Sequence, residues 1–389
     1  METAPHGRLV LIATALVAAV LGTIHAFSVF LLPLETTFSL PRATVSLTYS
    51  FALVCLTLAV TFGPLIYSRA PPFCLILLAC LTAAVGALWA ARADSIEGIW
   101  LGYSLGFGAA NGLGYGFGLQ FAAHAMPTRK GWAMGVVTAA YALGAAVSPP
   151  IFTSAVASGG FPAAMHGLAA VLVGVGLVSA GLIWISKARY RPETAGETPD
   201  HPPRLFPLWL AYAAGVAAGL MAIGHAAGLA EARGISGWTA PAVLAVCNLS
   251  GSLVAGVLMD RMAPRRLLAA LAVASALALA VLALVPGLTL IALGGVGFAY
   301  GGTIAAYPAA IATRFPGALG PKVYGRVFTA WGAAGLAAPW LAGRIFDATG
   351  VYGPALWLAA VLAAVSAILA GLTFAANSGP AQGDRHAGP

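Results

Sequence analysis

Long apolar stretches alternate with short polar segments from residue 9 to residue 375. A hydrocarbon core about 30 Å thick is crossed by about 20 helical residues, and twelve of the stretches reach roughly that length. Unpaired backbone groups cannot face lipid, and these segments are too long and too uniformly apolar for barrel strands. The pattern therefore predicts an all-α membrane protein with twelve transmembrane helices near residues 9–33, 44–67, 73–91, 97–123, 132–155, 164–186, 206–230, 238–260, 266–286, 288–312, 324–345 and 352–375.

Composition and charge support this prediction and orient the chain. Hydrophobic residues make up 60% of the chain and charged residues 8%, which excludes a water-soluble domain of this size. If the N-terminus is cytoplasmic, only four of the 19 Lys and Arg lie on the outer side, namely Arg42, Arg92, Arg233 and Arg344. Because basic residues concentrate in cytoplasmic loops, both termini are predicted to be cytoplasmic, in a multi-pass inner-membrane protein. The net charge of +8 then reflects topology and contact with anionic membrane lipid, and no nucleic-acid partner is expected.

A proline-rich segment divides the chain into two halves. Residues 187–205 combine four prolines with acidic residues, which is typical of a linker. We predict an N-terminal six-helix bundle over residues 1–186, a cytoplasmic linker over 187–205, a C-terminal six-helix bundle over 206–376 and a disordered cytoplasmic tail over 377–389.

The two halves share small-residue patterns in the same order. Gly106-x-Gly108, in the fourth predicted span, recurs 189 positions later as Gly295-x-Gly297 in the tenth. Such matches are common in a chain rich in Ala and Gly, but several in order at similar offsets indicate a duplication. The sequence thus predicts two pseudo-symmetric bundles.

The loop after the eighth predicted span carries a longer motif. It reads Gly256-Val-Leu-Met-Asp260-Arg261-Met-Ala-Pro-Arg265-Arg266 and resembles the signature Gly-x-x-x-Asp-Arg-x-Gly-Arg-Arg of the major facilitator superfamily. The resemblance implies the major facilitator fold and alternating access, in which two bundles rock about a site near the membrane midplane. It also implies a conformational gating role for Gly256, Asp260, Arg261 and Arg265. The corresponding segment of the first half has Tyr67 in place of the acidic residue.

Three other segments resemble the oxalate/formate antiporter and monocarboxylate transporter group of that superfamily. They are Gly114-Tyr115-Gly116, Arg129-Lys130-Gly131 and Gly219-Leu-Met221-Ala-Ile-Gly224-His225. Members of that group carry Asn-x-x-Gly-Arg in the eighth span, where the guanidinium pairs with the substrate carboxylate. Here the segment is Asn248-Leu-Ser-Gly251-Ser252, so a serine stands in the position of the arginine.

Two histidines are the candidate proton-coupling residues. His25 in the first span and His225 in the seventh are the only ionisable side chains deep in the predicted bundle besides Tyr and Cys. An imidazole takes up and releases a proton near physiological pH, so either can carry a coupled proton or bind substrate. The alternative is a neutral histidine whose ring is hydrogen-bonded to a neighbouring helix.

The remaining candidate substrate-binding residues are uncharged. Asn111 and Tyr115 are four apart and share a helix face, where an amide and a phenol suit an oxygenated or heteroaromatic solute; the alternative is interhelical packing. No Asp, Glu, Lys or Arg lies inside the predicted spans away from their ends, which favours a substrate that is neutral, zwitterionic or carried with its proton. Further candidate lining residues are Tyr141, Asn248, Ser252, Tyr300, Tyr307 and Trp331.

These patterns predict a secondary transporter, proton-coupled or facilitative, of a small organic solute that is monocarboxylate-like or neutral. The spacing of Met221 and His225 suits Cu(I), and the superfamily's copper importers resemble this segment in part. A vitamin-like heteroaromatic such as riboflavin is another alternative substrate, and a membrane sensor without transport is an alternative function. Nucleophile–base spacings, zinc signatures and carboxylate pairs are not found in the spans, so we expect no enzymatic activity and no cofactor. We also expect the protein to be a monomer.

Overall fold

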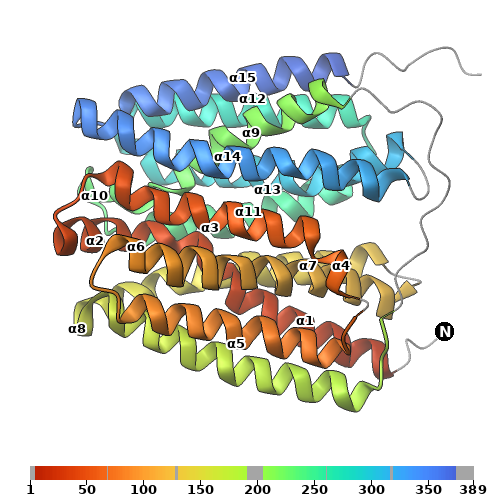
Figure 1. Ribbon diagram of the computed structural model, residues 1–389. Coiled ribbons are helices and arrows are strands. Elements are labelled where there is room, and N and C mark those ends of the chain that lie inside the picture. The colour runs from red at the N-terminus through yellow and green to blue at the C-terminus, as the bar shows by residue number, and fades with distance from the viewer. Residues whose placement is uncertain are drawn as a thin grey trace, which may run out of the picture.

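The computed structural model describes residues 5–67, 69–127, 130–190, 205–259, 261–315 and 319–373. Within these residues every regular element is a helix, and the long helices lie side by side (Figure 1). The first half forms α1 (Pro5–Leu21), the 3₁₀ helix η1 (Gly22–Phe30), α2 (Leu31–Phe38), α3 (Arg42–Phe62), α4 (Pro64–Tyr67), α5 (Pro72–Ala91), α6 (Ile96–Ile99), the π-helix η2 (Trp100–Phe107), α7 (Gly108–Ala125) and α8 (Lys130–Ser186). The second half forms α9 (Phe206–Ile223), α10 (Ala226–Glu231), α11 (Thr239–Met259), α12 (Pro264–Leu284), η4 (Pro286–Leu288), α13 (Thr289–Arg314), α14 (Leu319–Thr349) and α15 (Gly353–Thr373).

The long helices coincide with the predicted spans. By length and composition, 9 helical stretches in the described residues can cross a membrane. One of them, α8, holds both the fifth and the sixth predicted span, and its backbone leaves the helical conformation at Gly159 and Gly160. Gly160 has a φ of 70°, in the left-handed region that favours glycine. The prediction of an all-α membrane protein is therefore confirmed, while twelve spans and cytoplasmic termini stay predictions.

Several span boundaries differ from the prediction, and two of these differences bear on the candidate site. The first span was expected to end near residue 33, but α1, η1 and α2 continue without interruption to Phe38. The seventh was expected as one helix over 206–230, but α9 ends at Ile223 and α10 begins at Ala226. The intervening His225 donates its backbone N–H to the Ala222 carbonyl at 3.3 Å, a tight turn that ends the α-helical pattern. Most of the predicted linker and the predicted tail lie outside the described residues, as does Asp260.

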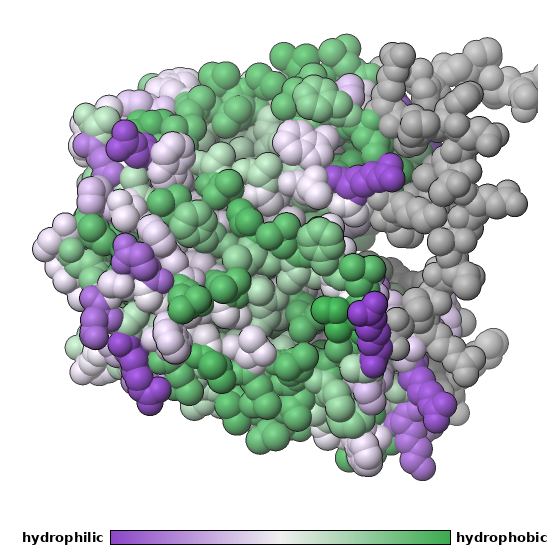
Figure 2. Space-filling model, viewed as in Figure 1, coloured by the Kyte–Doolittle hydropathy of each residue, from purple (hydrophilic) through white to green (hydrophobic). Residues whose placement is uncertain are grey.

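The surface is apolar around the middle of the molecule and polar towards its ends. Figure 2 shows mostly hydrophobic side chains over the central part and the strongly hydrophilic ones near the two ends. Large apolar side chains such as Val85, Ile185 and Ile368 are 63%, 66% and 62% exposed. An apolar surface of this extent is stable only against lipid, which agrees with a membrane protein.

Glycines allow close packing of α11 on α13. Gly251 of α11 lies against the backbone of Phe298, and Gly301 of α13 lies against the backbone of Asn248. A Cβ atom at either glycine would collide with the facing main chain. Because lipid supplies no hydrophobic force between helices, such close backbone contact is a main source of their association. The two helices are therefore expected to move together.

The two halves of the chain meet along two helix pairs. Most helices contact others of their own half, whereas α3 packs on α14 and α8 packs on α11. Three glycines of α14, Gly332, Gly335 and Gly343, lie respectively against Thr57, Leu53 and Ala43, so the contact extends over most of α3 and the second half of α14. This contact brings the start of α3 to the end of α14.

The topology can be tested by thiol labelling. Ser236 is exposed in the loop between α10 and α11, and Thr198 belongs to the predicted cytoplasmic linker. Cysteines introduced at the two positions are expected to react with a membrane-impermeant maleimide from opposite sides, Ser236→Cys in intact cells and Thr198→Cys only in inverted vesicles. Labelling of both from one side would contradict the predicted topology.

Candidate functional site

His25 lies in the interior part of the first helical stretch, between α1 and α2, and pairs with a tyrosine that the sequence analysis did not select. The 3₁₀ segment η1 carries His25, whose Nδ1 lies 2.7 Å from the hydroxyl of Tyr49 in α3. The His25 ring also meets the Tyr141 ring edge-on at 5.6 Å. Tyr49 is 1% exposed and stacks on Phe27 at 5.8 Å, so its hydroxyl is held in place. An imidazole and a phenol at this distance can share or relay a proton.

Asn111 and Tyr115 both contact Tyr141, as their shared helix face predicts. The Tyr141 hydroxyl donates to Asn111 Oδ1 at 3.0 Å, and Asn111 Nδ2 donates to the Leu21 carbonyl at 2.6 Å. The Tyr115 ring lies 4.5 Å from the Tyr141 ring. Asn111 is completely buried with both ends of its amide occupied, which is the arrangement expected of a link between helices.

The role of Asn111 can be decided by substitution. Asn111→Leu leaves the Leu21 carbonyl and the Tyr141 hydroxyl without this partner, and each such group costs about 1–3 kcal/mol. We expect a clearly lower melting temperature in detergent, and a smaller decrease for Tyr141→Phe, which removes only one of the two bonds. If Asn111→Leu melts like the wild type but no longer binds substrate, Asn111 is a binding residue.

The second half of the protein also contains a hydrogen-bonded pair of aromatic residues near Tyr49 and Tyr141. The indole N–H of Trp331 in α14 donates to the hydroxyl of Tyr300 in α13 at 2.9 Å, and the Trp331 ring stacks on Phe328 at 5.6 Å. The hydroxyls of Tyr49 and Tyr141 lie close enough to that of Tyr300 for electrostatic interaction. Hydrogen-bonding aromatic groups of the two halves thus lie near one another.

Other predicted lining residues lie within the second half. Ser252 is half-buried and donates its hydroxyl to the Gly301 carbonyl at 3.0 Å. Asn248, one turn earlier, is half-buried beside Gly301 as well. Tyr307 packs against Tyr212 with ring centroids 4.4 Å apart. The structure therefore brings Ser252 and Asn248 to α13.

His225 occupies the break between α9 and α10. Its Nε2 lies 2.8 Å from the Pro339 carbonyl of α14; a carbonyl can only accept a hydrogen bond, so Nε2 carries a proton. Met221 is on the last turn of α9, and the break removes the continuous helix on which the Met221–His225 copper hypothesis was built. The described residues also contain no group of three or more His, Cys, Asp or Glu suited to a metal ion.

The motif at the end of α11 is not covered by other parts of the protein where it is described. Gly256, Arg261 and Arg265 are exposed, and Asp260 lies outside the described residues. In the first half, Tyr67 is 1% exposed and packs on Phe117 at 5.1 Å. The tyrosine that replaces the acidic residue is therefore a core residue of the first half.

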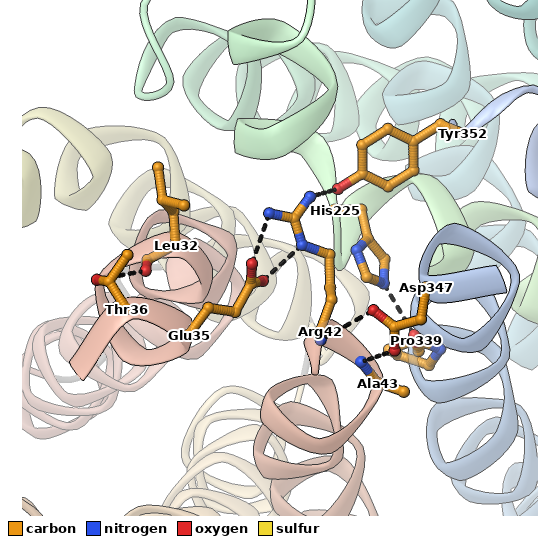
Figure 3. Close-up of polar contacts among 9 residues, drawn as sticks. All are labelled: Leu32, Glu35, Thr36, Arg42, Ala43, His225, Pro339, Asp347 and Tyr352. Carbon is orange, nitrogen blue, oxygen red and sulfur yellow. Dashed lines mark hydrogen bonds and ion pairs between the residues drawn. The ribbon is translucent and has the colours of Figure 1, made fainter. Parts of the chain in front are cut away.

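The sequence analysis missed a charged cluster (Figure 3) at the end of the molecule where α2 and α10 lie (Figure 1). We call it the Arg42 cluster: Glu35 of α2, Arg42 of α3, Asp347 of α14 and Tyr352, just before α15. Arg42 is 8% exposed; its Nε and Nη2 donate to Glu35 at 2.5 and 2.8 Å, and its Nη1 donates to the Tyr352 hydroxyl at 2.5 Å. Glu35 lies 7 positions before Arg42, so this ion pair was accessible to sequence reasoning, whereas the partners more than 300 positions away were not.

Comparison with known proteins assigns the family. The model of the Major Facilitator Superfamily matches residues 10–316 and 249–389. The chain belongs to this superfamily. It is a multi-pass membrane transporter, as the superfamily motif after α11 implied.

Individual relatives are distant. The Escherichia coli (strain K12) protein named uncharacterized MFS-type transporter YhjX is 25% identical over 344 residues, which cover 83% of this chain and 84% of that protein. Among solved structures, a D-xylose–proton symporter is similar with a TM-score of 0.75 at 13% identity, covering 93% of this chain and 97% of the symporter. An inward-facing bacterial homologue of the human lysosomal transporter Spinster has a TM-score of 0.68 at 17% identity, covering 96% and 95%. At these identities the structural likeness shows the major facilitator fold alone.

Proposed function

We propose that this transporter carries a small neutral solute, or a monocarboxylate-like acid together with its proton, across the inner membrane by alternating access. The observation that carries the proposal is that His25, Tyr49 and Tyr141 of one half contact one another and lie near the Tyr300–Trp331 pair of the other half. These groups offer hydrogen bonds and aromatic faces but no fixed charge. They suit a ligand that needs no counter-ion.

Proton coupling is assigned to His25 in this proposal. His25 is half-buried and its ring nitrogen faces a phenol, whereas His225 is completely buried and its Nε2 is occupied by a main-chain carbonyl. A group that exchanges a coupled proton must reach the solute cavity or water in at least one state. Symport fits this arrangement, and the solute-linked proton would then move in the same direction as the solute. The E. coli relative supports the inner-membrane location.

A vitamin-like heteroaromatic such as riboflavin is the second candidate substrate. Tyr115, Tyr141 and Trp331 present aromatic faces on which a flat ring can stack. A thermal-shift panel of monocarboxylates, neutral polyols, amino acids and flavins separates these classes, because only a ligand of the folded state raises its melting temperature. A copper importer would instead respond to Cu(I).

The proton-coupling role is tested with the solute found by that panel. In proteoliposomes, His25→Gln is expected to abolish accumulation driven by a pH gradient while keeping solute exchange, because exchange needs no net proton movement. Tyr49→Phe, which removes only the hydroxyl at 2.7 Å from His25, is expected to shift the pH dependence of uptake. The matched control is His166→Gln, at an exposed histidine of α8. Wild-type pH dependence in His25→Gln would make His25 a structural residue.

A further inference from the structure

The start of α3 is capped by a side chain from the other half of the protein. Pro41, the residue before α3, provides no side-chain cap. The first backbone N–H groups of a helix otherwise lack partners and usually bond to a nearby Ser, Thr, Asp or Asn. Here the N–H groups of Arg42 and Ala43 donate to the two carboxylate oxygens of Asp347, at 3.0 and 2.9 Å. The cap therefore exists only while the two halves are in contact at this end.

The same contact stabilises Asp347. This residue lies in the last turn of α14, which ends at Thr349. A carboxylate at that position is opposed by the negative end of its own helix, whereas the positive start of α3 attracts it. Separation of α3 from α14 would return the Asp347 carboxylate to the unfavourable end of α14 and expose two unpaired N–H groups of α3.

Arg42 connects the halves a second time. Its guanidinium is held by Glu35 within its own half and by the Tyr352 hydroxyl from the other half, and it lies 4.3 Å from the centre of the Phe346 ring. Because Arg42 is almost completely buried, loss of the contacts to Tyr352 and Phe346 has to be compensated by water. The contacts of the Arg42 side chain therefore add to the Asp347 cap in resisting separation of the halves at this end (Figure 3).

We propose that the Arg42 cluster, with Asp347 as the cap of α3, holds the end of the transporter near α10 closed and sets the equilibrium between the closed and open states of that end. In the predicted topology this is the outer end, so the cluster favours the inward-open state. The proposal depends on alternating access, but not on the identity of the solute or on His25. Weakening the cluster should therefore expose this end even when no solute or pH gradient is present.

The test uses a cysteine reporter beneath the cluster. Ser46 is 1% exposed, lies beside Gly343 of α14, and its hydroxyl has no hydrogen-bond partner, so Ser46→Cys places a buried thiol at the α3–α14 contact without removing a hydrogen bond. Cys55, Cys74, Cys80 and Cys247 are replaced by serine. The rate of reaction with a membrane-impermeant maleimide is measured in intact cells and in inverted vesicles, so that the result does not depend on the orientation of the protein.

In this background, Asp347→Ala is expected to raise the labelling rate at Ser46→Cys about tenfold, which corresponds to about 1.4 kcal/mol in the closing equilibrium. Tyr352→Phe, which removes a single hydroxyl, is expected to raise it about threefold. The control is Asp94→Ala, which removes an exposed carboxylate between α5 and α6, at the same end, and should leave the rate unchanged.

Unchanged labelling in both Asp347→Ala and Tyr352→Phe overturns the proposal. If Asp347→Ala does not yield folded protein, Tyr352→Phe alone decides. A faster labelling of Ser46→Cys in that variant supports the proposal, and a labelling rate equal to that of Ser46→Cys without the second substitution overturns it. Faster labelling combined with wild-type pH dependence in His25→Gln would keep the proposal and reject the assigned proton-coupling residue, so the two can fail separately.

Discussion

Gly251→Val is expected to prevent the accumulation of folded protein. The Gly251 backbone lies directly against Phe298 of α13, so the added side chain would collide with main chain that has no flexible group to move aside. Overpacking of a well-packed core usually costs about 1–3 kcal/mol, and a collision with backbone belongs to the upper end of that range or beyond. A protein of ordinary stability would lose a large part of its free energy of unfolding.

Gly256 provides the matched control on the same helix. It is five positions from Gly251 in α11, but it is exposed and no atom lies within 4 Å of where its Cβ would be. Gly256→Val should therefore leave the melting temperature at or slightly above the wild-type value, since most residues are better helix formers than glycine. Fluorescence-detected gel filtration and thermal unfolding compare the two. Equal losses in both variants would show that the α11–α13 contact is not the cause.

A dicarboxylate such as oxalate is expected to bind at least about a hundredfold more weakly than a monocarboxylate or neutral solute. A charge placed at the bilayer centre costs about 3 kcal/mol on insertion scales, and the sequence has no Lys or Arg inside the predicted spans away from their ends to offset it. The charged groups of the Arg42 cluster are at one end of the molecule and already paired. Isothermal titration of the purified protein measures the ratio directly. Micromolar affinity for oxalate would mean that another cation serves the site.

The substitution Ser252→Arg is expected to destabilise the protein and not to change its substrate selectivity. Ser252 donates to the Gly301 carbonyl, so Ser252→Arg would place a long cation between the closely packed α11 and α13. We expect a lower yield of folded protein and no new affinity for carboxylates. Ser252→Ala, which loses only one hydrogen bond of about 1 kcal/mol, is the control. A folded Ser252→Arg variant that binds carboxylates would place this position in the solute cavity.

Sequence periodicity located the membrane helices because burial in lipid imposes one composition over a whole span. It missed the break after Ile223, since Gly224 occurs among many glycines that do not interrupt helices. Helix-face reasoning placed Asn111 and Tyr115 together, and both contact Tyr141. Local rules of this kind work where the partners share one helix.

Sequence reasoning could not predict contacts between segments that are far apart in the chain. The pairing of His25 with Tyr49 depends on how η1 rotates against α3, and the capping of α3 by Asp347 joins residues 305 positions apart. Counted by sequence alone, Arg42 was one of four outer basic residues and indicated only topology. Its burial, which gives it an energetic role, follows from the packing of α3 on α14.

The 3₁₀ segment η1 makes the first span longer than an α-helix of the same number of residues. A 3₁₀ helix rises about 2.0 Å per residue and an α-helix about 1.5 Å, so conversion of a nine-residue segment such as η1 would shorten it by about 4.5 Å. The conversion would keep the chain helical and its backbone groups bonded, which hydrocarbon surroundings require. It would also rotate His25 relative to α1 and draw α2, with Glu35, inward along the membrane normal. One helix could thus couple a change at the central histidine to a change at the end of the molecule without any part of it unfolding.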